Sequence, residues 1–197
     1  KQQAGENANS IIGHSFVYDT RDNRQSPNSG YSITANQDFA GLGGDNKFIR
    51  HELKADYYLP LAKKWTYATY LMGGNVTGIG QDVRINNRYF TGSQEIRGFA
   101  NAGIGPRDLI TNDPLGGNTY YAFSNEVRFP LGLDDDLGVS GAAFVDIGNS
   151  YGIDQMGPNI GRSNSLRATA GLGVAWASPF GPIRVDFGQA FLKQTYD

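Results

Sequence analysis

Apolar and polar residues alternate one by one along most of the chain. Between 31 and 39, Tyr31, Ile33 and Ala35 fall on one face, while Ser32 and Thr34 fall on the other. A side-chain period of two is typical of β-strands. The same alternation predicts further strands at about 10–20, 49–59, 65–78, 118–130, 137–148, 166–177 and 182–192. With no long amphipathic helix in view, the sequence predicts an all-β, antiparallel chain of about eight strands.

The segments between these strands are short and long in turn. Short turns with Asp, Asn, Pro or Gly are expected at 19–30, 59–65, 130–136 and 178–182, and longer loops at 41–46, 79–117 and 149–165. This asymmetry is typical of outer-membrane barrels. Aromatic residues near strand ends fit the belts at the two membrane interfaces, namely Tyr18, Tyr57, Tyr58, Trp65, Phe129, Trp176 and Phe180. A soluble β-sandwich with one polar face per sheet is the alternative.

Composition and charge narrow the classes of function. A formal net charge of −2 provides no basic surface for nucleic acid. The absence of cysteine excludes disulfides, thiolate metal sites and cysteine nucleophiles. A mean hydropathy of −0.42 resembles that of a soluble protein. A transmembrane barrel is compatible with that value, because alternate residues of its strands face water.

The segment from 79 to 117 is long for a connection without regular structure, and such connections are usually functional or disordered. Its stretch 89–106 is too rich in Gly and polar residues for a strand. The same stretch nevertheless carries five large apolar residues, namely Tyr89, Phe90, Ile96, Phe99 and Ile104. These argue against disorder. We therefore expect a loop that folds back into the protein, where Arg97 needs a buried anionic partner.

Two carboxylates on neighbouring predicted strands could be that partner. If Tyr121 points outward on its strand, alternation turns Glu126 inward, and if Val145 points outward, Asp146 points inward. A guanidinium forms bidentate, charge-assisted hydrogen bonds with carboxylates. A desolvated arginine without such partners is costly. The strand phases therefore predict that Arg97 pairs with Glu126 and Asp146.

Several motifs together resemble a known family. Ile96-Arg97-Gly98-Phe99 resembles the [V/I]RG[F/Y] motif of the BamA-type outer-membrane assembly superfamily, which includes TamA, the two-partner-secretion transporters and organellar relatives. Further similarities follow in the expected order, at 19–30, 116–130, 144–149 and 166–183. They cover nearly the whole chain, and the pattern at 178–183 is closer to BamA than to the secretion transporters.

The resemblance implies a sixteen-stranded transmembrane barrel preceded by periplasmic POTRA domains. Residues 1–197 would be a single barrel portion with strands eight to fifteen, and the POTRA domains, the first strands and the last strand would be absent. Ile96, Arg97, Gly98 and Phe99 would form a latch on a loop inside the lumen, held by Glu126 and Asp146 in the barrel wall.

The resemblance also implies a function. The chain would be the barrel part of an insertase in the bacterial outer membrane, which folds and inserts β-barrel proteins. Its partners would be unfolded outer-membrane β-barrel proteins, outer-membrane lipids and, through the absent POTRA domains, accessory assembly lipoproteins. The alternative in the same superfamily is a protein-translocating pore of the TamA or two-partner-secretion kind.

No enzymatic activity, cofactor or metal site is expected. The two histidines, His14 and His51, fall on apolar faces or near strand ends, and Ala55 stands where an H-E-x-x-H motif needs its second histidine. An outer-membrane hydrolase would need a catalytic grouping near one rim, and these histidines do not provide one. A small closed barrel of eight strands is a further alternative, but its lumen would be filled by side chains and would not admit the 79–117 loop.

Overall fold

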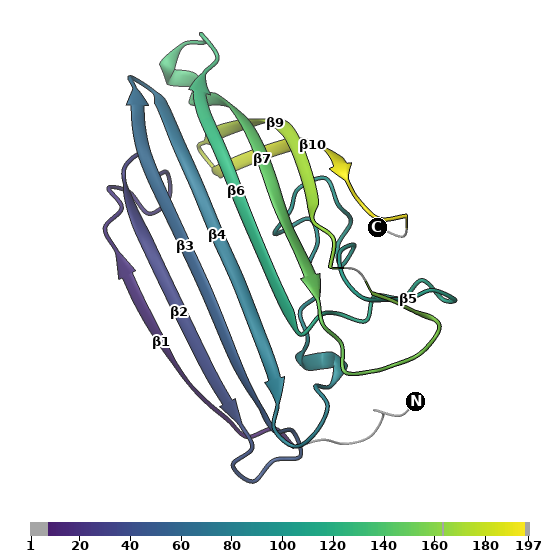
Figure 1. Ribbon diagram of the computed structural model, residues 1–197. Helices are drawn as coiled ribbons and strands as arrows, with labels where there is room; N and C mark the ends of the chain where they lie inside the picture. Colours follow the sequence, from purple (N-terminus) through teal and green to yellow (C-terminus); the bar gives the residue numbers. More distant parts are fainter. Residues whose placement is uncertain (1–7, 163, 196–197) are drawn as a thin grey trace.

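The chain forms one large antiparallel sheet. The computed structural model describes residues 8–162 and 164–195, and Figure 1 shows the sheet curving from β1 to β10. The strand order is β1-β2-β3-β4-β6-β7-β9-β10, and each strand is antiparallel to its neighbours. The strands of this sheet are β1 Ile11–Asp19, β2 Gly30–Ala40, β3 Phe48–Ala62, β4 Trp65–Gly78, β6 Thr119–Pro130, β7 Val139–Tyr151, β9 Arg167–Ser178 and β10 Gly181–Leu192.

The eight predicted strands are confirmed, with ends that differ by a few residues. The sandwich alternative is wrong, because these strands form one sheet and not two. The small closed barrel is not formed either, since β1 and β10 are the two ends of the sheet within the described ranges. The sheet is a curved wall with two edge strands.

The two faces of the wall differ completely in charge. Residues directly opposite each other on paired strands point to the same face, so the strand registers assign every side chain to a face. All twelve Asp, Glu, Lys and Arg residues of the eight strands lie on the concave, inner face: Asp19, Asp38, Arg50, Glu52, Lys54, Asp56, Glu126, Arg128, Asp146, Arg167, Arg184 and Asp186. The outer face of these strands therefore carries apolar and neutral polar residues together with the two histidines.

The loops at the two ends differ in length as predicted. Residues 20–29, 63–64, 131–138 and 179–180 connect strands at one end, and 41–47, 79–118 and 152–166 connect them at the other. We call these the turn end and the loop end. The described helical segments are the 3₁₀ turns η1 Ile85–Asn87 and η2 Asp135–Leu137, and neither has the length to cross a membrane.

The loop between β4 and β6 lies on the concave side of the sheet (Figure 1). It is more ordered than the sequence predicts, because it contains η1 and a short strand, β5 Arg107–Asp108, that pairs with β8 Ile160–Gly161 of the next long loop. This pairing was not visible from periodicity, since two residues are too few to show a period. The 79–118 loop is thus hydrogen-bonded to the 152–166 loop as well as to the wall.

The buried apolar residues lie between the wall and this loop. Ile96, Phe99 and Ile104 of the loop pack with Ala122 of β6, and Met72 and Ala190 flank the group. A second cluster joins Val83 of the loop to three wall residues, Ala40, Phe48 and Val76, with Tyr89 packed against it. Phe90 is the exception among the five large apolar loop residues, with 42% of its surface exposed.

The aromatic belt at the turn end is present on the outer face with one correction. Tyr18 stacks near Tyr31, and Trp65 near Phe129, with ring centroids 5.7 Å and 5.5 Å apart. Tyr58 does not belong to this belt. It is 5% exposed and points inward, where its ring meets the edge of Tyr70. The neighbouring Tyr57 takes the outer position, because adjacent residues of a strand alternate between faces.

Candidate functional site

The inner wall presents two carboxylates side by side. In the β6–β7 pair Ser124 lies opposite Asp146, and Glu126 lies opposite Phe144 one step further along the same face. Glu126 and Asp146 are each 1% exposed. Both carboxylates lie on interior strands, since β6 is paired with β4 and β7, and β7 with β6 and β9. The carboxylates are therefore held on rigid elements.

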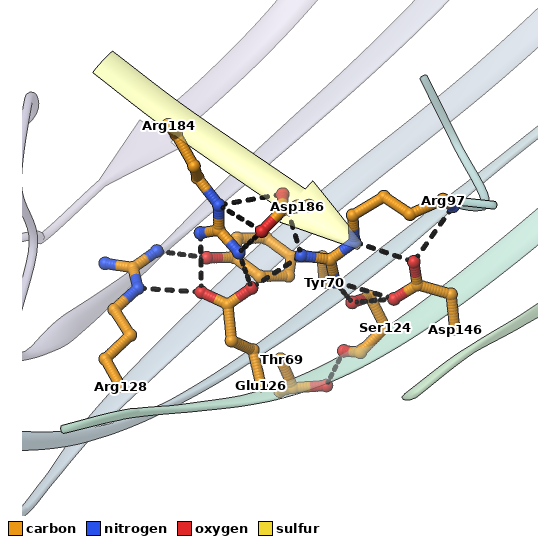
Figure 2. Close-up of polar contacts among 9 residues, drawn as sticks. All are labelled: Thr69, Tyr70, Arg97, Ser124, Glu126, Arg128, Asp146, Arg184 and Asp186. Atoms are coloured by element: carbon orange, nitrogen blue, oxygen red, sulfur yellow. Dashed lines mark hydrogen bonds and ion pairs between the residues drawn. The ribbon is translucent and has the colours of Figure 1, made fainter. Parts of the chain in front are cut away.

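Arg97 from the loop reaches both carboxylates. Its Nε and Nη2 donate to Oδ2 and Oδ1 of Asp146, at 2.8 Å and 2.7 Å, which is a bidentate pair. Its backbone N–H also donates to Asp146 Oδ2, at 3.0 Å. Nη1 donates to Glu126 Oε2 at 2.8 Å, and Nη2 to Ser124 Oγ at 2.9 Å. Figure 2 shows this guanidinium between the wall carboxylates and β10.

Glu126 is the centre of a wider network. Besides Arg97, it accepts hydrogen bonds from Arg128 Nε at 2.9 Å and from Arg184 Nη1 and Nη2 at 2.8 Å and 2.7 Å. Arg184 in turn pairs with Asp186 two residues along β10. Arg128 also donates to the hydroxyl of Tyr70. Residues of β4, β6, β7 and β10 thus meet the loop tip at one place (Figure 2).

The charges of this network balance. Three guanidinium groups, Arg97, Arg128 and Arg184, face three carboxylates, Glu126, Asp146 and Asp186. Buried charges are tolerated when they are paired and hydrogen-bonded. Burial alone would lower the pKa of Arg97, but the hydrogen bonds to Asp146 and Glu126 more than offset this and leave its pKa above the usual value. Arg97 therefore stays charged in place.

An aromatic ring completes the seat of Arg97. The guanidinium carbon lies 3.5 Å from the centre of the Phe144 ring. Planar guanidinium groups stack on aromatic faces, whereas an ammonium group makes no such planar contact. The bidentate pair, the Ser124 hydroxyl and the ring together select arginine over lysine at this position.

The residues beside Arg97 fix the loop tip by shape. Ile96 is fully buried in the cluster with Phe99. Gly98 has φ of +88°, and a Cβ there would lie 2.9 Å from the carbonyl oxygen of Gly188 on β10. Only glycine combines a free left-handed conformation with such a close backbone approach. Among the four motif residues, Arg97 makes the hydrogen bonds to the wall, while Ile96, Gly98 and Phe99 contribute packing.

The base of the loop, at a distance from the tip that carries Arg97, is held by further hydrogen bonds. Arg50 of β3 donates to the Asn87 carbonyl at 2.8 Å. Arg88, which is 5% exposed, donates to the carbonyls of Val83 and Leu115. Burial lowers the pKa of Arg88, because its charged form loses water. The loop is therefore attached to the wall at both its base and its tip.

Sequence reasoning located Arg97, Glu126 and Asp146 but missed two charged members of the network. Arg184 and Asp186 were not singled out, although the alternation of Ile183, Val185 and Phe187 on the outer face would have turned both inward. Their proximity to Glu126 depends on the curvature that brings β10 over the loop, and no local pattern reveals that curvature. Within the described ranges, no three His, Asp or Glu residues gather as a metal site would require.

Comparisons with known proteins identify relatives of this wall and loop. The chain is 36% identical over 195 residues to the outer membrane protein assembly factor BamA of Neorickettsia risticii, which covers 98% of the chain and 26% of the relative. It is 31% identical over 192 residues to BamA of Nitratidesulfovibrio vulgaris, covering 95% of the chain and 24% of the relative. The mouse sorting and assembly machinery component 50 homolog is 31% identical over 147 residues, 73% of the chain and 31% of the relative. The chain therefore spans about a quarter to a third of the length of these relatives.

A solved structure supports the fold. The crystal structure of BamA from Haemophilus ducreyi lacking POTRA domains 1–3 superposes with a TM-score of 0.85, at 24% identity, over 95% of this chain and 40% of that one. The family model of the Omp85 superfamily domain matches residues 1–197. With this match over its full length, the chain belongs to the Omp85 superfamily.

Proposed function

We propose that this chain is the barrel-wall portion of an outer-membrane protein assembly factor, placed in the bacterial outer membrane. The observation that carries the proposal is the similarity to BamA over nearly the whole chain, at 36% identity. The charge-free outer face of all eight strands supports the membrane placement, because a charged side chain facing lipid is costly.

The proposed activity is physical and involves no covalent chemistry. A β-barrel protein that enters the membrane must satisfy its backbone hydrogen bonds, since lipid offers none. An exposed strand edge can pair with an incoming strand by β-augmentation. The substrates would be unfolded outer-membrane β-barrel proteins, and lipids and accessory lipoproteins would be the further partners. The names of the relatives favour assembly over the transport-pore alternative.

In this proposal the network around Arg97 acts as a latch. It joins the loop tip to β6 and β7 and, through Glu126, to Arg184 of β10. The latch would hold the loop inside the lumen and keep β10 at its angle to the rest of the wall.

The domain limits also remain a proposal: residues 1–197 would supply strands eight to fifteen of a sixteen-stranded barrel.

The experiment uses the full-length protein reconstituted into lipid vesicles with a chemically unfolded β-barrel substrate. Folding of the substrate is followed by its resistance to unfolding on cold SDS gels. We expect Arg97→Glu to slow substrate folding markedly, and the exchange Arg97→Glu with Asp146→Arg to recover part of the rate, because Arg97 is the cation bonded to Asp146. Wild-type protein that accelerates folding no more than empty vesicles would exclude an assembly function. Normal rates with Arg97→Glu would exclude the latch alone.

A further inference from the structure

A row of polar side chains crosses the outer face of four neighbouring strands. The register places His14 of β1 opposite Gln37 of β2, Gln37 opposite His51 of β3, and His51 opposite Asn75 of β4. Because opposite residues share a face, all four point away from the loop and its charged network. This is the face that carries no Asp, Glu, Lys or Arg on the strands. The two histidines that have no role in the latch thus lie together on it.

Apolar residues border the polar row on both sides. Phe39 and Ile49 lie two positions nearer the loop end, while Ala35 and Leu53 lie two positions nearer the turn end. Two hollows open on this surface. One has a volume of about 420 Å³ and is lined by the row and by Phe16 and Leu53. The other, of about 390 Å³, extends from His14 and Gln37 to Phe39 and Ile49. Asn36 and Glu52 also border the first hollow, although the register places both on the inner face. The mixture of polar and apolar residues on the outer face suits an amphiphile.

The row offers hydrogen-bond donors that the protein itself does not use. Gln37 Nε2 lies 3.1 Å from His51 Nδ1 in a hydrogen bond, and the other ring nitrogen of His51, Nε2, has no hydrogen-bond partner among the described residues. The His14 side chain makes no hydrogen bond within the part of the chain that the structure describes. Asn75 differs, since it is bonded to Thr119 and Thr77. The unused donors are therefore concentrated on β1 to β3.

A cation lies at the loop end of the same strands. Lys47 precedes β3, and its carbonyl accepts the N–H of Ile79 at 2.9 Å, which continues the β3–β4 ladder. Lys47 therefore points to the same outer face as Ile49 and His51. No described carboxylate forms an ion pair with Lys47. Its long side chain can extend along an apolar surface while the ammonium group stays at the interface.

The position of the row suits a lipid headgroup. His14 and His51 are three residues from the loop ends of β1 and β3, which is about 10 Å along a strand. Unsatisfied polar groups in hydrocarbon cost several kcal/mol each. A ligand at this place must therefore bring hydrogen-bond acceptors. Lys47 lies four positions before His51, toward the loop end, and favours a negatively charged ligand that extends toward it.

We propose that His14, Gln37 and His51, together with Lys47, bind the phosphate group of a membrane lipid, with an acyl chain along Phe16 and Leu53. A phosphate carries acceptor oxygens and negative charge, which match the unused donors and the cation of this surface. The site lies on the opposite face of the wall from the latch. The inference rests on the proposed membrane placement, because only then does this face meet lipid.

The test compares two lipids that differ only in the phosphate. Full-length protein in a non-ionic detergent is titrated with phosphatidic acid or with a diacylglycerol of the same acyl chains, and bound lipid is counted by native mass spectrometry. We expect His14→Leu, Gln37→Leu and His51→Leu combined to weaken phosphatidic acid binding about tenfold, and Lys47→Gln to weaken it less. A matched control, Thr69→Val with Asn125→Leu, removes polar groups elsewhere on the same face and should leave binding unchanged.

Four results would overturn the inference. If the triple variant binds phosphatidic acid as the wild type does, the row is not the site. If the wild type binds both lipids equally, the surface holds only acyl chains. If the wild type retains neither lipid, the row does not bind a lipid phosphate. The proposed function is tested separately by substrate folding in vesicles, so a failure of the site and a failure of the function can be distinguished. Stronger loss in the control than in the triple variant would also count against the site.

Discussion

Among the carboxylates of the latch, Asp146 depends most on Arg97, because it has fewer other partners than Glu126. Asp146 is 1% exposed, and apart from Ser124 its side-chain partner is Arg97, which supplies both guanidinium bonds and a backbone N–H. Glu126 by contrast keeps Arg128 and Arg184 when Arg97 is removed. The cost of losing Arg97 should therefore fall mainly on Asp146.

We expect Arg97→Met to destabilise the folded protein by about 3–5 kcal/mol, because it leaves a buried carboxylate without its cation. Asp146→Asn alone should also destabilise, and the double variant should cost clearly less than the two single changes added together. Urea unfolding in detergent micelles measures all three. As a control, Arg24→Met removes an arginine whose side chain is 84% exposed and should cost less than about 1 kcal/mol. Additive effects of the first two changes would mean that the pair is not coupled.

At the residue scale, the sequence was sufficient to predict the latch pairing because alternation is a strong constraint. Once Val145 and Tyr121 were assigned outward, Asp146 and Glu126 could only point inward. Ser124 and Arg128 follow from the same phase. Arg184 was within reach of this reasoning, but its contact with Glu126 joins residues 58 positions apart through the curvature of the sheet. The functional role of the latch stays a prediction.

The loop and the turns are the elements that depend most on single backbone positions. Gly98→Ala should detach the loop tip from β10, because φ is +88° and the added Cβ would lie 2.9 Å from the Gly188 carbonyl oxygen. We expect a lower urea midpoint and faster proteolysis between 79 and 117. Gly132→Ala is the matched control, since φ is +75° there but nothing lies within 4 Å of the new Cβ. It isolates the conformational strain, of about 1 kcal/mol. Equal effects of the two changes would show that the contact with Gly188 is unimportant.

The turn between β1 and β2 should respond to acid. Asp22 Oδ1 accepts backbone N–H groups of Asn28, Ser29 and Asn23, at 3.0 Å, 3.2 Å and 2.9 Å. The first two of these bonds are the main reason that the pKa of Asp22 lies below its usual 3.8. A depressed pKa in the folded state contributes stability above pH 3.8, and this stability is lost as the pH falls through the folded value.

We therefore expect the difference in urea midpoint between wild type and Asp22→Asn to be constant above about pH 5 and to shrink on acidification. Using the difference removes the titration of the other carboxylates, which both proteins share. Asp113→Asn, in the long loop, serves as the comparison. A difference that grows as the pH falls would contradict the sign of the effect.

Across the whole molecule, the fold was predictable as far as alternation and turn lengths determine it. Eight strands, their faces and the two kinds of connection followed from residues such as Ile33, Leu53 and Val145. The β5–β8 pairing and the approach of β10 to the loop did not, because they depend on contacts between distant segments that have no period of their own. Tyr58 was misassigned for a simpler reason: it adjoins Tyr57, and aromatic character alone does not indicate which of the two faces outward.

The separation of charge between the two faces gives the strongest test of the molecule as a whole. Leu53 lies on the outer face in the middle of β3 and is 43% exposed, while Leu42 lies in the loop between β2 and β3 and is 64% exposed. In water, either position could accept arginine at little cost, because both side chains are already exposed. In a membrane, arginine at a lipid-facing position near the middle of a strand costs about 2–4 kcal/mol, and near the interface about 0–1 kcal/mol.

We therefore expect Leu53→Arg to reduce the yield of full-length protein inserted into vesicles, while Leu42→Arg inserts like the wild type. Protection from protease measures the inserted fraction, and circular dichroism in detergent checks that each variant still folds. The same pair of variants also tests which face of the wall meets lipid. An arginine on the outer face is costly only if that face lies against lipid. Equal insertion of both variants would mean that the outer face of β3 does not meet lipid, and the membrane placement of this wall would have to be abandoned.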